Sequence, residues 1–169
     1  MHDPDIESPD MAPEIGIIKP LHRLDTSKNK VLYLKKTGDW TAMINSLGLC
    51  SNIYWFGGVY WKPNQLIEIL NAVTGWDYTV DEFMVAGERI NTYCRMFNVR
   101  EGITRRDDVL PKRFTEPLVG GPTNGQFISS QEFESMLNNY YEICGWDKEN
   151  GAPTKERLTE LGLVDIVPK

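Results

Sequence analysis

The sequence predicts an all-α fold, an irregular helical domain with long loops. Two observations carry this prediction. Apolar residues recur at helical spacing in several segments between residues 31 and 161, and most of these segments begin at a capping residue and end at a glycine. No segment shows the alternating pattern of convincingly paired strands. We therefore divide the chain into an irregular leader or strap, residues 1–30, and a helical domain, residues 31–169.

The leader has little helical periodicity. It contains four of the ten prolines of the chain. Such a density of proline favours extended or irregular backbone that does not fold by itself. Two interpretations stay open: a flexible tail, or a strap that lies across a partner or a missing domain.

The first predicted helix covers about residues 40–47, whose apolar side chains share one face. Gly38 is expected to break or weaken any extension toward the N-terminus, and Asp39 to cap the helix. Gly48 is the expected C-terminal stop. This places Cys50 just beyond the helix end.

The sequence around Cys50 allows two interpretations of this residue. Near a helix C-terminus the macrodipole disfavours a thiolate unless a cation or metal compensates. The alternative is a buried, unreactive cysteine, since no second Cys or His lies close enough in the sequence to form a local chelate. Cys94 and Cys144 fall on the apolar faces of predicted helices, and both are expected in the core.

An aromatic segment, residues 51–62, follows Cys50 and is either a core-lining loop or a surface that stacks on a ligand. Its aromatics between Tyr54 and Trp61 are the part that would bind a partner. Pro63 is the expected first residue of the next helix, which Gly75 ends.

Two capping boxes predict the longest helices. Thr79 with Glu82 opens a helix to about Asn98, and Ser129 with Glu132 opens the helix Gln131 to Cys144. One buried stripe is expected along the first of these helices, formed by Phe83, Met84, Gly87, Ile90, Cys94 and Phe97. A long irregular connection separates the two helices. A short helix capped by Thr154 and an extended tail, residues 163–167, complete the chain.

Charged residues between 88 and 108 are expected to pair with one another. Glu88 and Arg89 are interpreted as a partly buried structural pair. The three arginines of residues 100–108 match the three acids there in number, which predicts a self-satisfied cluster of ion pairs.

Composition excludes several functional classes. The chain has 169 residues, 41% of them hydrophobic, and a net charge of −6, so that nothing attracts a nucleic-acid backbone. No apolar run approaches the length of a membrane span, and the acidic N-terminus is unlike a signal peptide. Three widely spaced cysteines form no disulfide framework. We therefore expect a cytoplasmic protein with no membrane span and no nucleic-acid partner.

Six short motifs in order give a resemblance to a known family. They are Ser46-Leu47-Gly48-Leu49-Cys50, Asn71-Ala72-Val73-Thr74-Gly75, Gly87-Glu88-Arg89-Ile90, Phe97-Asn98-Val99-Arg100-Glu101-Gly102, Asp107-Asp108-Val109-Leu110-Pro111-Lys112-Arg113 and Tyr140-Tyr141-Glu142-Ile143-Cys144-Gly145-Trp146-Asp147. Over about residues 15–163 the chain resembles the C-terminal helical domain of the tungsten-containing aldehyde ferredoxin oxidoreductase family. That family includes the tungsten subunit of a benzoyl-CoA reductase.

The resemblance implies cofactors and site residues. In the family, an Asp-x-x-Gly-Leu-Cys pattern contributes to binding a tungsten bis-pterin, and its cysteine is one ligand of a [4Fe-4S] cluster. This carries over to Cys50 as metal ligand and to Asn45, Leu49 and Ser51 as pterin contacts. Asn45 departs from the family, which usually has Asp there. The implied enzyme oxidises aldehydes or acts on related oxo or acyl substrates, uses tungsten or molybdenum, and has ferredoxin as its electron partner.

The resemblance also implies that this chain is incomplete as an enzyme. Full members carry an N-terminal domain and a three-cysteine run that are absent here, so no cofactor and no activity are expected in the isolated chain. The partner would be the missing N-terminal part or a split partner chain. The alternative function is a free-standing helical interaction module that has lost cofactor binding.

Overall fold

The computed structural model describes residues 12–18, 21–22, 24–50 and 62–166. Within these ranges the chain is helical, and its β pairing is limited to isolated bridges at Ala12–Ile17 and Trp146–Pro153. The α-helices are α1 (Lys28–Ser46), α2 (Pro63–Thr74), α3 (Val80–Arg100), α4 (Ser130–Cys144) and α5 (Lys155–Glu160). Four 3₁₀ turns are η1 (Pro13–Ile15), η2 (Arg105–Asp107), η3 (Lys112–Thr115) and η4 (Val164–Ile166). The predicted all-α class is confirmed.

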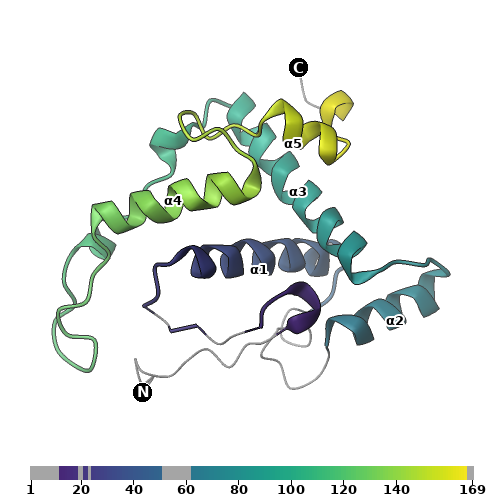
Figure 1. The fold of residues 1–169 in the computed structure, drawn as a ribbon, viewed down its shortest axis with the longest axis horizontal. Coiled ribbons are helices and arrows are strands. Elements are labelled where there is room, and N and C mark those ends of the chain that lie inside the picture. The colour runs from purple at the N-terminus through teal and green to yellow at the C-terminus, as the bar shows by residue number, and fades with distance from the viewer. Residues whose placement is uncertain (1–11, 19–20, 23, 51–61, 167–169) are drawn as a thin grey trace.

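Helix α1 is the central element, because it packs against both α3 and α4. Figure 1 shows α4 running alongside α1 while α3 runs diagonally across the end of α1 that leads to Cys50. Helix α2 packs against α3 and η1. Among the described helices, none combines the length and the apolar character that crossing a membrane requires.

The hydrophobic core lies where the leader, the second half of α1, α2 and the start of α3 meet. Its buried members are Ala12, Ile15, Ile17, Trp40, Met43, Ile44, Leu66, Ile67, Leu70 and Phe83. The rings of Trp40 and Phe83 lie 5.0 Å apart between centroids. Complete burial of a side chain such as Phe83 stabilises the fold by about 2 kcal/mol. This core therefore fixes the C-terminal end of α1.

Residues 12–17 of the leader pack against this chain's own core. Ala12, Ile15 and Ile17 are each 5% exposed or less. Gly16 closes the turn in the left-handed region, with a φ of 77°. Residues 12–17 thus form part of this chain's own core.

The prediction for the first helix is wrong in two respects. Helix α1 begins at Lys28 and runs through Gly38 without a break, and Asp39 is a buried residue inside it, not its cap. A glycine inside a helix costs about 1 kcal/mol relative to alanine. The packing of α1 against α3 and α4 outweighs that local cost.

The prediction of a buried apolar stripe is also wrong for the second half of α3. Phe83 and Gly87 are buried as expected, but Cys94 is exposed and Phe97 is 45% exposed. The buried positions there are taken by Thr92, Arg95 and Met96 instead. Two of these three residues are polar. The periodicity of apolar residues in the sequence therefore cannot identify the buried face of this half of the helix.

The predicted helix ends agree closely with the structure. Both capping boxes form, at Thr79 with Glu82 and at Ser129 with Glu132. Gly75 ends α2 in the left-handed region, and Thr154 caps α5. The prediction of an extended tail is wrong, since Val164–Ile166 forms a 3₁₀ turn.

Candidate functional site

The candidate site is the turn that ends α1. Gly48 has a φ of 68°, a backbone conformation that glycine adopts without steric cost. The N–H of Gly48 donates to the carbonyl of Asn45 and the N–H of Leu49 to that of Ile44, both at 3.1 Å. These two bonds form the Schellman motif that closes many helices. The direction in which the chain leaves α1 is therefore fixed.

Leu49 anchors this turn to the core. Its side chain is half-buried and, with Leu47, packs against the core cluster that contains Ile44. Such a contact between the residue after the glycine and the last turn of the helix commonly accompanies the Schellman motif. The backbone that precedes Cys50 is thus held both by hydrogen bonds and by packing.

Two of the predicted site residues lie exposed on this turn. Cys50 is exposed, which contradicts the interpretation of a buried, unreactive cysteine. Asn45, in the last turn of α1, is exposed as well. Ser51 and the aromatic segment with Tyr54 and Trp61 lie outside the described residues. At this turn the side chains of Asn45 and Cys50 are thus open to solvent, whereas that of Leu49 is half-buried.

The other two thiols differ from each other. Cys94 is exposed on α3, whereas Cys144 is buried at the end of α4, as predicted. Burial raises the pKa of Cys144 to about 12, although Lys35 and a hydrogen bond with Tyr140 oppose the effect of burial. Cys144 is thus held as a neutral thiol.

These differences predict a pattern of thiol reactivity. Iodoacetamide at neutral pH is expected to alkylate Cys50 and Cys94 in the folded chain and to spare Cys144 until the protein is unfolded. Peptide mass spectrometry before and after denaturation measures this pattern. Rapid alkylation of Cys144 in the native protein would contradict the packing of α4.

Whether this chain can bind a metal cluster depends on the ligand side chains that it offers. Within the described ranges no group of three or more His, Cys, Asp or Glu side chains could hold a metal ion. Cys50 offers one exposed thiol on a rigid turn. This donor set fits a chain that supplies one ligand to a cluster whose remaining ligands come from elsewhere.

A partly buried ionic network between α1, α3 and α5 was not predicted from the sequence. Glu88 does not pair with Arg89, which is exposed. It accepts from Lys35 at 2.6 Å and from Arg157 Nε at 2.9 Å. Lys35 also lies 2.7 Å from Asp39. Burial alone would lower the pKa of Lys35, but the two carboxylates outweigh burial and raise it.

A second missed cluster surrounds Arg95 on α3. Its guanidinium donates to both carboxylate oxygens of Asp108, at 2.9 and 2.6 Å, and its Nε donates to the carbonyl of Gly151 at 2.8 Å. Tyr141 also donates to Asp108, and Trp146 covers the guanidinium with its ring centroid 5.2 Å away. Burial and the bond to Asp108 raise the pKa of Tyr141 to about 12. Arg95 thereby ties the connection after α3 to α4.

The predicted self-contained cluster of residues 100–108 is therefore only partly right. Arg100 pairs with its neighbour Glu101 at 2.8 Å. Arg105 instead pairs with Glu134 on α4, and Asp108 pairs with Arg95. Asp107 accepts from the backbone N–H of Thr104 and caps η2.

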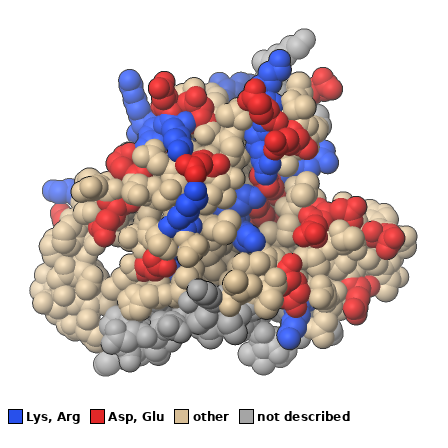
Figure 2. All heavy atoms as spheres, in the orientation of Figure 1, with Lys and Arg blue, Asp and Glu red and all other residues tan. Residues whose placement is uncertain are grey.

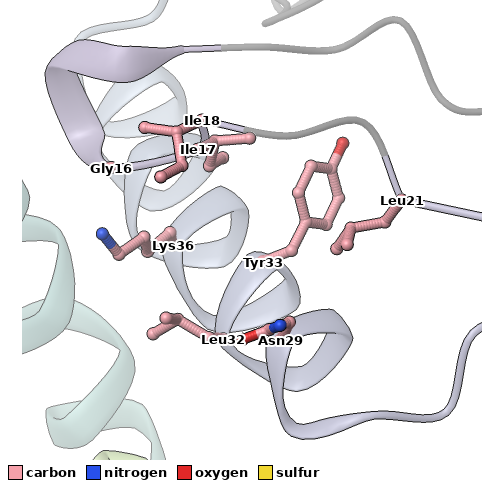
Figure 3. A pocket seen from close by; sticks show the side chains of 8 residues that line it. All are labelled: Gly16, Ile17, Ile18, Leu21, Asn29, Leu32, Tyr33 and Lys36. Atoms are coloured by element: carbon pink, nitrogen blue, oxygen red, sulfur yellow. The ribbon is translucent and has the colours of Figure 1, made fainter.

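A cavity of about 290 Å³ lies between the leader and α1. Figure 3 shows the ring of Tyr33 standing between Leu21 and the segment Gly16 to Ile18. Lys36 at its edge donates to the carbonyl of Ile15. The described residues that line the cavity include no acid and no thiol. Its described lining is mostly apolar, with Asn29, Tyr33 and Lys36 as the polar side chains and without a carboxylate or thiol to bind a metal.

Comparison with known proteins places the chain in a family. A model of the family described as aldehyde ferredoxin oxidoreductase, domains 2 and 3, matches residues 4–163. The tungsten-containing aldehyde ferredoxin oxidoreductase of Pyrococcus furiosus is 37% identical over 159 residues, which are 92% of this chain and 25% of that protein. The aliphatic sulfonate oxidoreductase WOR-like subunit of the same species is 34% identical over 60% of this chain and 18% of its own length.

A solved structure shares the fold. The active-site complex of benzoyl-coenzyme A reductase with 1,5-dienoyl-CoA matches 80% of this chain and 20% of its own, with a TM-score of 0.60 and 24% identity. This chain spans about a quarter of the length of the aldehyde ferredoxin oxidoreductases that it matches. Because a model of domains 2 and 3 of that family matches residues 4–163, the chain belongs to the aldehyde ferredoxin oxidoreductase family.

Proposed function

We propose that this chain is the C-terminal part of a tungsten or molybdenum pterin oxidoreductase and that Cys50 supplies one thiolate to its [4Fe-4S] cluster. The observation that carries the proposal is the exposed thiol of Cys50, which follows directly on a Schellman turn. An exposed position lets the thiol reach ligands held by another part of the enzyme. The core contact of Leu49 keeps that thiol in one place.

The roles of the neighbouring residues follow from their chemistry. The amide of Asn45 can both donate to and accept from a pterin ring, although it lacks the charge of an aspartate. Leu49 contributes by holding the turn, and Ser51 remains a proposed pterin contact. When bound, the metal pterin would supply the two-electron chemistry and the cluster a path for electrons to ferredoxin.

The proposed substrates are aldehydes or related oxo and acyl compounds. The relatives named above act on different compounds, so family membership does not choose among these substrates. Because a [4Fe-4S] cluster is held by four cysteine thiolates, one thiolate from this chain is insufficient. We therefore expect the isolated chain to be inactive until the remaining polypeptide of the enzyme is present.

Metal analysis tests the proposed function. The chain is isolated anaerobically from its own host together with the polypeptides that bind it, and iron, tungsten and molybdenum are measured. The proposal predicts a brown protein that contains iron and either tungsten or molybdenum. A colourless preparation free of all three metals would contradict the proposal and favour the interaction module.

The glycine of the Schellman turn gives a further prediction. Alanine at Gly48 would meet no atom within 4 Å, so its cost comes only from the left-handed backbone, about 1 kcal/mol. Gly75 is the matched control, with a φ of 74° and equally open surroundings. Gly48→Ala and Gly75→Ala are expected to lower the free energy of unfolding alike, as urea titration would measure.

Of the two variants, only Gly48→Ala should also lower the iron content of the assembled enzyme, because Gly48 lies in the turn that positions Cys50 and Gly75 does not. Restoration of the iron by Gly48→Asn would support this reason, since asparagine tolerates the left-handed conformation. Equal iron loss in the Gly75→Ala control would contradict it.

A further inference from the structure

An ordered, nearly uncharged arm projects from the body of the chain. We use the name arm for residues 114–128, which comprise the end of η3 and most of the connection from it to α4. Figure 1 shows the arm at the left, extending beyond the N-terminal end of α4. Every residue from 111 to 122 is exposed. The arm has a single charged side chain, Glu116, although a quarter of all residues in the chain are charged.

The backbone of the arm is held by its own hydrogen bonds. The N–H of Ile128 donates to Phe114 at its base, and Leu118 and Gln126 are joined by a bond of 2.9 Å from N–H to carbonyl. The side chain of Asn124 accepts from the N–H of Gly120 at 2.8 Å, which fixes the tip. The arm therefore presents a preformed surface and has little conformational entropy to lose on binding.

The surface that the arm presents is apolar. Phe114 is 53% exposed, Phe127 52% and Val119 92%. A cavity of about 330 Å³ lies at its base. Its lining includes the apolar side chains of Leu24, Leu118 and Ile128 and the charged side chains of Arg113, Glu116 and Glu132. In Figure 2 the arm is the tan margin at the left, in contrast to the red and blue clusters elsewhere on this face. Depletion of charge with exposed aromatic residues is typical of the central part of a protein interface.

We propose that the arm is the docking surface for the polypeptide that supplies the other three quarters of the enzyme. This inference rests on the proposed function, because it assumes such a polypeptide. The family match over residues 4–163 includes the arm, and the aldehyde ferredoxin oxidoreductase of Pyrococcus furiosus is about four times as long as the stretch that matches this chain. In those proteins three quarters of the sequence lies outside the matched region and is available to cover the arm.

The experiment uses the full chain and the host polypeptide that carries the remaining part of the enzyme. Val119→Asp and Val119→Lys each place a charge on the arm, and Val73→Asp is the matched control because Val73 is 80% exposed on α2. The proposal predicts that both Val119 variants lose affinity for the partner by about tenfold or more, because a charge would be buried in an apolar interface. Val73→Asp is expected to bind as the unmodified chain does.

Each other outcome overturns the proposal. Absence of binding by the unmodified chain would reject the proposed function together with the docking surface. Equal binding by all variants, or equal loss in Val73→Asp, would reject the arm alone and leave the proposed function intact. If the chain by itself forms dimers that Val119→Asp dissociates, the arm is an interface between copies. Circular dichroism of each variant, expected to be unchanged at this exposed position, separates loss of binding from unfolding.

Discussion

Gly87→Ala is expected to destabilise the chain by about 3 kcal/mol or more, as large an effect as a single methyl group produces in a core. A Cβ atom at Gly87 would lie 2.1 Å from the carbonyl oxygen of Asp39 and 2.7 Å from its carbonyl carbon. Both atoms belong to the backbone of α1, so that no rotation of a side chain relieves the overlap. Helices α1 and α3 would have to move apart, and with them the core that supports the Cys50 turn.

Gly38→Ala is the matched control for this prediction. Gly38 also lies inside a helix, but its added Cβ would meet only the side-chain nitrogen of Asn91, at 3.9 Å. Alanine there is expected to raise the free energy of unfolding by about 0.5–1 kcal/mol. Urea titration followed by circular dichroism measures both variants. Equal stability of Gly87→Ala and the unmodified chain would contradict the close contact of α1 and α3.

Arg95→Met is expected to cost about 3 kcal/mol, the lower end of the range for breaking a buried ion pair. Methionine retains most of the volume of the side chain, but it removes the Arg95 donors to Asp108 and to the carbonyl of Gly151, which leaves Asp108 with the bond from Tyr141. Arg100→Met is the control, because Arg100 pairs at the surface with Glu101. Its expected cost is below about 1 kcal/mol.

Removal of Arg95 should also change the dependence of stability on pH. Burial would raise the pKa of Asp108, but the bonds from Arg95 and Tyr141 outweigh burial and lower it below the ordinary value of 3.8. The stability that Asp108 contributes is therefore present above pH 3.8 and is lost as the pH falls through the lowered pKa. In Arg95→Met this acid-dependent loss is expected to shrink. An unchanged acid limb in urea titrations from pH 5 to 2 would contradict the role of Arg95.

The parts of the fold that local chemistry determines could be predicted from the sequence. Thr79, Ser129 and Thr154 bond to residues three positions away, and Gly75 ends α2 through its own backbone. The course of α1 could not be predicted in this way. The break expected at Gly38 is a preference of about 1 kcal/mol, and packing against two other helices outweighs it.

The polar core could not be predicted because its partners lie far apart in the sequence. Arg95 and Gly151 are separated by 56 positions, and Glu88 and Arg157 by 69. Periodicity detects apolar faces, so it passed over Thr92 and Arg95 and assigned Cys94 to the core. For the candidate site, Gly48 predicted the end of the helix and the position of Cys50 beyond it. The proposed role of Cys50 came from the family resemblance, and its exposure came from the structure.

We propose that Cys50 binds a cluster shared with the remaining polypeptide of the enzyme. Electron paramagnetic resonance of the reduced, anaerobically assembled complex tests it most directly. Cys94→Ser is the matched control, because both thiols are exposed. Cys50→Ser is expected to abolish or shift the [4Fe-4S] signal, and Cys94→Ser is expected to leave it unchanged. An unaltered signal in Cys50→Ser, or equal loss in both variants, would contradict this proposal.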